Sequence, residues 1–117
     1  MSTDFRDAVG RLNRIPGVQG AILVDREDGI PVEADAMEHI RVPIAAALTA
    51  QLFRRASRSA EAARFRELRS LQLQAQRGNV FAAAAGPLLV VVVTDEDANI
   101  GLVRTEVARL AQELAAV

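Results

Sequence analysis

The stretch VPIAAALTAQLFRR, residues 42–55, is apolar around far more of its circumference than a surface helix of a monomer requires. At about 100° per residue, its apolar side chains form two stripes, which are Ile44, Leu48 and Leu52 on one side and Val42, Ala46, Ala50 and Phe53 on another. One stripe about 100° wide is enough to cover a sheet. The surplus stripe therefore predicts a second surface, and the sequence leaves open which stripe faces the chain's own core.

The composition is typical of one globular domain covering residues 1–117. Half of the 117 residues are hydrophobic and a quarter are charged, which suffices for a single core. The formal charge of −1 and the scarcity of aromatic residues argue against nucleic acid as a ligand. Without cysteine or a secretory signal, we expect a cytoplasmic protein. The longest apolar run, residues 80–93, is too short to span a bilayer, so no direct membrane insertion is expected.

Apolar periodicity along the whole chain predicts three helices and five strands in the order α-β-β-α-β-β-β-α. The helices are expected near residues 5–12, 42–53 and 97–116, and the strands near residues 18–24, 30–34, 71–76, 80–85 and 88–93. Beyond Phe53 we expect the second helix to fray over residues 54–63. Pro31 lacks a backbone donor, so it should lie at a strand start, edge or bulge. The result is an α+β domain with an antiparallel five-stranded sheet and helices on its faces.

No constellation typical of an enzyme or a metal site stands out in this chain. His39 is the only histidine, which excludes a histidine triad or a two-histidine metal site within one chain. Asp25, Glu27 and Asp28 precede Gly29, but the pattern of a calcium-binding loop is missing. The chain has no lysine, which excludes the standard phosphate-loop lysine. We therefore expect a protein that is not an enzyme and carries no cofactor.

Several short motifs accompany this order of elements: PGV at 16–18, GAILVD at 20–25, RG at 77–78, LLVVVV at 88–93 and GLVR at 101–104. With their spacing, the chain resembles the Roadblock/dynein-light-chain family, which includes the bacterial MglB-type regulators of Ras-like GTPases. The resemblance covers nearly the whole chain. It implies a Roadblock/profilin-like fold.

The resemblance also implies a dimer whose sheet is continuous across the two-fold axis. The helix 42–53 would pack against its mate, and the strand 71–76 would pair with its own copy. The implied interface residues are Val42, Ala45, Ala46, Leu48, Thr49, Leu52, Phe53, Leu71, Gln72, Leu73 and Gln74. The second chain is either an identical copy or another Roadblock-type chain. An isologous homodimer is the commonest form of oligomer.

The function implied by the resemblance is binding of a Ras-like small GTPase, to regulate its nucleotide cycle or to scaffold it. The alternative is a structural adaptor that assembles a larger complex regardless of the bound nucleotide. Candidate GTPase contacts are Gln51, Arg54, Arg55 and Arg58, at the polar margin of the helix. The three arginines could supply an arginine finger, contact acidic switch regions or simply be solvated. The resemblance argues against a finger, because MglB-type regulators are thought to hold the GTPase's own groups in place.

Overall fold

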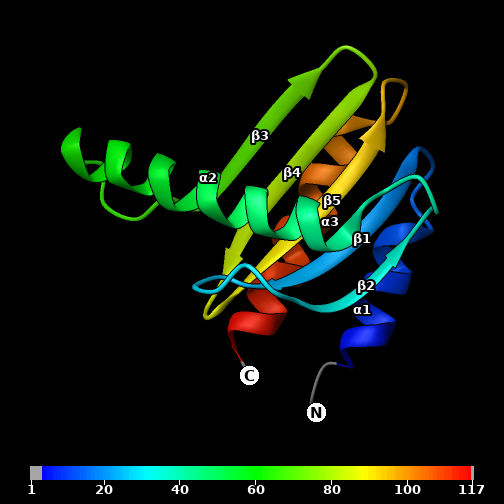
Figure 1. The fold of residues 1–117 in the computed structure, drawn as a ribbon, viewed down its shortest axis with the longest axis horizontal. Helices are drawn as coiled ribbons and strands as arrows, with labels where there is room; N and C mark the ends of the chain where they lie inside the picture. Colours follow the sequence, from blue (N-terminus) through cyan, green and yellow to red (C-terminus); the bar gives the residue numbers. More distant parts are fainter. Residues whose placement is uncertain (1–3, 117) are drawn as a thin grey trace.

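The computed structural model describes residues 4–116 and contains all eight expected elements in the expected order (Figure 1). The helices are α1 (Phe5–Asn13), α2 (Val42–Ala62) and α3 (Ile100–Ala115). The strands are β1 (Val18–Asp25), β2 (Pro31–Ala36), β3 (Ser70–Ala75), β4 (Gly78–Ala85) and β5 (Leu88–Asp95). The predicted α+β class and the element order are confirmed.

The five strands form one antiparallel sheet in the order β2-β1-β5-β4-β3, with β1, β5 and β4 in its interior. The two edges are therefore β2 and β3. Pro31 is the first residue of the edge strand β2 and pairs with Val24 beside a register shift. This confirms the expected placement of a residue that cannot donate to the ladder.

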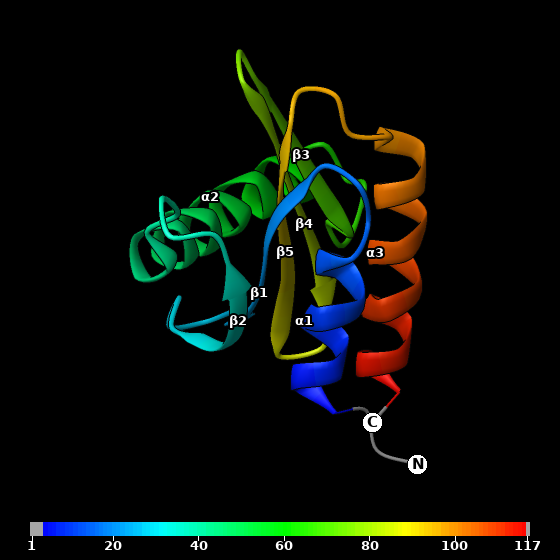
Figure 2. The same cartoon turned by 90° about the vertical axis from the view of Figure 1, so that its right-hand side faces the viewer.

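The helices divide unequally between the two faces of the sheet. Helices α1 and α3 lie side by side on one face, and α2 crosses the other face alone (Figure 2). Alternate residues of β1 serve the two layers: Ala21 and Leu23 pack in the cluster under α1 and α3, whereas Ile22 and Val24 pack in the cluster under α2. Because the interior strands are buried on both faces, they show continuous apolar runs rather than alternation.

Helix α2 is longer than the sequence analysis predicts. We expected fraying after Phe53, but the helix continues without interruption to Ala62. Alanine and arginine are strong helix formers, so their abundance in this stretch extends the helix instead of ending it. As a result, Arg54, Arg55 and Arg58 lie in the middle of the helix and not at its C-terminus.

Candidate functional site

The two apolar stripes of α2 lie on different sides of the helix, and only one of them is covered. The sheet-facing stripe is Val42, Ala46, Ala50 and Phe53, whose last three members are fully buried. The outer stripe is Ile44, Leu48 and Leu52, whose exposed fractions are 51%, 59% and 36%. The structure thus decides which stripe faces the core.

Small side chains explain why the alanine-rich stripe faces the sheet. Ala46 and Ala50 on the helix meet a cluster that contains Ala82 of β4, so the backbones of helix and sheet can approach closely. Phe53 fills the remaining space as the largest fully buried side chain. The larger side chains of the outer stripe face solvent.

Burial within the protomer reduces the set of interface residues that the family resemblance implies. Ala46, Thr49 and Phe53 are among the implied interface residues, but they are 0%, 8% and 0% exposed within the single chain. Their side chains cannot meet a second chain unless the core opens, so these three are removed from that set. The other eight residues stay predictions. Five of them are exposed: Leu48, Leu52, Gln72, Leu73 and Gln74.

Strand β3 forms one edge of the sheet, and its Leu71 packs against the cluster under α2. It pairs with β4 alone, and within residues 4–116 no strand pairs with its other side. Leu73, opposite Val80, is 39% exposed. The strand SLQLQA carries no charge and no proline, whereas the other edge, β2, is protected by Pro31 and acidic side chains. Unpaired, unprotected edges are templates for another strand.

Arg54, one of the four candidate GTPase contacts, is occupied inside the protomer. Its Nη1 atom donates hydrogen bonds to the carbonyl oxygens of Arg26, at 3.1 Å, and Glu27, at 3.0 Å. The guanidinium of Arg26 lies 5.3 Å from the centre of the Phe53 ring, within the range of a cation–π contact. Arg54 therefore fastens the β1–β2 turn to α2. No local sequence pattern indicates this role, because 27 residues separate Arg54 from Glu27.

The other three candidates are available at the surface. Gln51, Arg55 and Arg58 are exposed on α2. On the helix, Gln51 and Arg55 flank the outer stripe. The structure brings polar and cationic groups together with exposed leucines on one helix.

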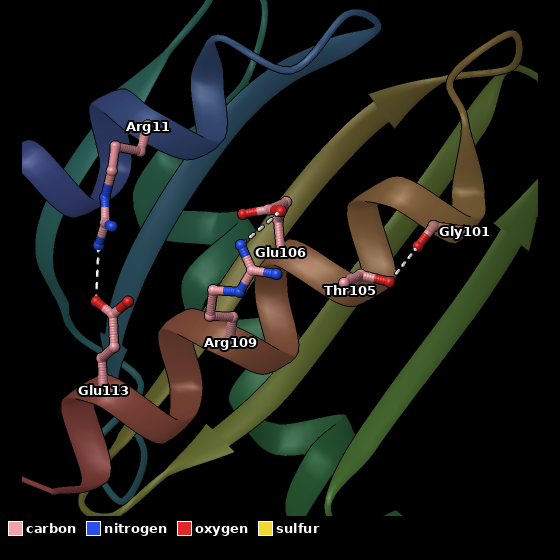
Figure 3. A network of polar contacts seen from close by, with 6 residues as sticks. All are labelled: Arg11, Gly101, Thr105, Glu106, Arg109 and Glu113. Atoms are coloured by element: carbon pink, nitrogen blue, oxygen red, sulfur yellow. Dashed lines mark hydrogen bonds and ion pairs between the residues drawn. The ribbon is translucent and has the colours of Figure 1, made fainter.

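The remaining polar groups form local contacts. On the opposite face, Arg11 of α1 pairs with Glu113 of α3 at 2.9 Å, and Arg109 pairs with Glu106 at 3.3 Å (Figure 3). The hydrogen bond to Glu113 raises the pKa of Arg11 above its ordinary value. Both are solvent-exposed ion pairs between or within helices, and they do not form a catalytic or binding site.

The acidic groups and the histidine likewise stay in local contacts. The Asp25 carboxylate accepts from the backbone N–H groups of Glu27 and Asp28, which closes the β1–β2 turn. The exposed His39 ring contacts the Gln19 side chain at 3.3 Å. Over residues 4–116, no group of three side chains is suited to hold a metal ion, and no helix is long and apolar enough to cross a membrane.

The Roadblock/LC7 domain pattern matches residues 5–94 of this chain, from α1 to the penultimate residue of β5. The chain belongs to the Roadblock/LC7 family. Roadblock/LC7 proteins are generally regulators or adaptors without catalytic activity. The protein MJ0714 of Methanocaldococcus jannaschii is 26% identical over 106 residues, which cover 91% of this chain and 89% of that protein.

Solved Roadblock/LC7 structures share the fold. A Roadblock/LC7 domain of Streptomyces avermitilis has a TM-score of 0.87 at 18% identity, covering 97% of both chains. MglB of Myxococcus xanthus has a TM-score of 0.86 at 20% identity, covering 99% of this chain and 91% of its own. Another MglB structure, with a TM-score of 0.84 at 23% identity over 94% of this chain and 84% of its own, has a tetrameric arrangement.

Proposed function

We propose that this Roadblock/LC7 chain forms a homodimer in the cytoplasm that binds a Ras-like small GTPase and regulates it or scaffolds it. One observation carries the proposal: the exposed outer stripe of α2 and the exposed Leu73 of the edge strand β3 lie on the same face of the sheet. In a monomer, the apolar side chains of the outer stripe and the unpaired backbone groups of β3 would stay exposed to solvent. A two-fold axis beside β3 would cover both at once, because strand would pair with strand and helix with helix.

Two contributions would favour association of such a dimer. Burying one large aliphatic side chain completely stabilises by about 1.5–3 kcal/mol, and the outer stripe offers three that are partly exposed. Strand pairing adds backbone hydrogen bonds, each worth about 1 kcal/mol net. The tetrameric arrangement of one MglB structure agrees with a fold that associates with its own copies.

The proposed GTPase contact uses Gln51, Arg55 and Arg58, which are exposed on α2. Guanidinium groups bind carboxylates in a two-pronged geometry, so they suit the acidic switch regions of a Ras-like GTPase. Arg54 is not part of this surface, because it already donates to the β1–β2 turn. The fold shared with MglB supports the proposal.

The test is hydrolysis of GTP by a Ras-like GTPase of the same organism, measured with and without the protein. We expect the two proteins to co-elute on gel filtration and the hydrolysis rate to change, with tighter binding of the GTP-loaded form. Equal binding of the GDP and GTP forms with an unchanged rate would favour the structural adaptor instead. A lack of both co-elution and rate change would contradict the proposal.

A further inference from the structure

A strongly basic stretch extends from the middle of α2 to the start of β3, and we call residues 54–69 the arginine segment. It holds six arginines against two glutamates, a net charge of +4, whereas the whole chain carries −1. The other residues together therefore carry −5. The positive charge is concentrated at one end of a molecule that is otherwise acidic.

The arginine segment projects from the body of the domain. The C-terminal half of α2 extends past β3 and leaves the sheet behind (Figure 1). Every residue from Glu61 to Glu67 is exposed. Phe65 is 78% exposed, more than any other large apolar side chain in the part of the molecule that the structure describes.

The end of α2 fixes Phe65 in place. The Arg64 N–H donates to the Glu61 carbonyl oxygen and the Phe65 N–H donates to the Ala60 carbonyl oxygen, both at 2.9 Å. These two bonds are those of a Schellman motif, whose left-handed residue is usually glycine. Here that residue is Arg64, with φ 62°. The residue after it usually packs back on its helix, but Phe65 faces solvent.

Phe65 therefore stands on a defined helix end with an arginine on each side. Arg66 is also left-handed, with φ 72°, a conformation that is uncommon for residues other than glycine. Glycine at either place would relax the backbone but would remove a positive charge. Local backbone geometry would favour glycine at positions 64 and 66, and a helix end of this kind would favour a packed side chain at position 65. The chain has two arginines and a solvent-exposed phenylalanine there instead.

We propose that the arginine segment docks the protein on an anionic lipid bilayer. Arg64, Arg66 and Arg69, which are exposed beyond the proposed GTPase contact, would bind the phosphates of lipid headgroups, and the Phe65 ring would enter the boundary between headgroups and acyl chains. The contact is peripheral and requires no spanning helix. The acidic remainder of the chain would be repelled by the same surface, which orients the molecule with this end toward the bilayer.

A bilayer fits these observations better than an acidic protein. A stable protein interface buries at least about 1,000 Å² with good shape complementarity, and Phe65 is a single projecting side chain among charged ones. The six arginines are spread along 16 residues, from the middle of α2 to the start of β3, which suits a diffuse layer of charge. Anionic membranes bind such segments through the sum of their charges and a few interfacial side chains.

Co-sedimentation with vesicles tests the proposal. We expect the wild-type protein to sediment with phosphatidylcholine vesicles that contain about 30% phosphatidylserine and to remain in solution with pure phosphatidylcholine. Salt of about 0.5 M should release it, because screening shortens the range of the attraction. Phe65→Ala should weaken binding about tenfold.

The substitution Arg64→Gly distinguishes an effect of charge on vesicle binding from an effect on the stability of the fold. Glycine is the preferred residue at this position of the motif, so the melting temperature should not fall, whereas vesicle binding should weaken about fivefold for one lost charge. Arg64→Gln with Arg66→Gln should weaken it about 25-fold. The control is Arg6→Gln with Arg14→Gln, which removes the same charge from exposed positions at α1 and should leave binding unchanged.

Two results would overturn the proposal. One is the same sedimentation with neutral and with anionic vesicles. The other is an absence of vesicle binding while Phe65→Ala and Arg64→Gly weaken the affinity for an acidic protein partner in solution, which would assign the segment to a protein interface. Neither result depends on whether the chain regulates a GTPase.

Discussion

The Nη1 atom of Arg54 lies 3.0 Å from the carbonyl oxygen of Glu27 and donates a hydrogen bond to it. Through this bond the middle of α2 holds the turn that joins β1 to β2. The turn is close to the helix at Gly29 as well, where an added Cβ would lie 3.2 Å from the Cα of Ala47. Helix α2, which is the only helix on this face of the sheet within residues 4–116, is thus held by the β1–β2 turn as well as by its packing on the sheet.

Arg54→Ala should lower the free energy of unfolding by about 1 kcal/mol, because two carbonyl oxygens lose a charged donor at an exposed site. For a domain of this size that corresponds to a fall in melting temperature of about 4–6 °C. Arg55→Ala is the matched control, since its side chain is exposed on the outer side of the same turn. Equal melting temperatures for the two variants would show that the bonds to the turn contribute nothing.

Phe53 within α2 and Phe65 just beyond its C-terminus should lose very different amounts of stability when each is replaced by alanine. Phe53 is fully buried and Phe65 is 78% exposed. Phe53→Ala removes a ring from the core and should cost about 3–5 kcal/mol, whereas Phe65→Ala should change stability by less than about 0.5 kcal/mol. Urea denaturation measures both. A large loss for Phe65→Ala would mean that another surface covers this ring in solution.

The sequence predicted what short-range patterns control and missed what distant contacts control. The alternation of leucine and glutamine identified β3, and the two apolar stripes correctly indicated that the sheet covers only part of the apolar surface of α2. The stripe that faces the sheet could not be chosen by hydrophobicity, because the leucines would have been preferred. Close approach of Ala46 to the sheet decides it, and that depends on residues far along the chain. The end of α2 gave no signal, since Arg64 stands where glycine usually marks a helix terminus.

Gly78→Ala should destabilise the protein strongly. A Cβ at this position would overlap the carbonyl oxygen of Thr94 in the paired strand β5, so the start of the β4–β5 ladder would have to shift. We expect a loss of about 3 kcal/mol or more. Gly86→Ala is the control, because a Cβ there meets open space and only its φ of +60° is unfavourable, at about 1–2 kcal/mol. Similar losses for both variants would contradict the clash.

Arg11→Gln should cost less than about 1 kcal/mol, although the Arg11–Glu113 pair joins α1 to α3 (Figure 3). Its two side chains are 48% and 37% exposed, so solvent screens the attraction. The pKa of Arg11 is raised from an already high value, and a raised folded pKa gives stability that is present below the unfolded pKa. This stability would be lost only as the pH rises above the unfolded pKa of arginine, far above the neutral range. Thermal melts of wild type and variant from about pH 6 to 9 should therefore differ by a constant amount.

Leu48→Glu and Leu73→Asp test the proposed dimer, because each places a charge on the surface that a second copy would cover. Both side chains are exposed in the single chain, by 59% and 39%, so the fold should survive while association is lost, at several kcal/mol for an unpaired buried charge. Light scattering should then report the 12.6 kDa mass of one chain with an unchanged far-ultraviolet circular dichroism spectrum. Leu102→Glu is the control: it is 41% exposed on α3, across the sheet, and should leave the dimer intact. A wild-type protein that is already monomeric at micromolar concentration would refute the dimer, and the outer stripe of α2 would then have to be covered by the GTPase itself.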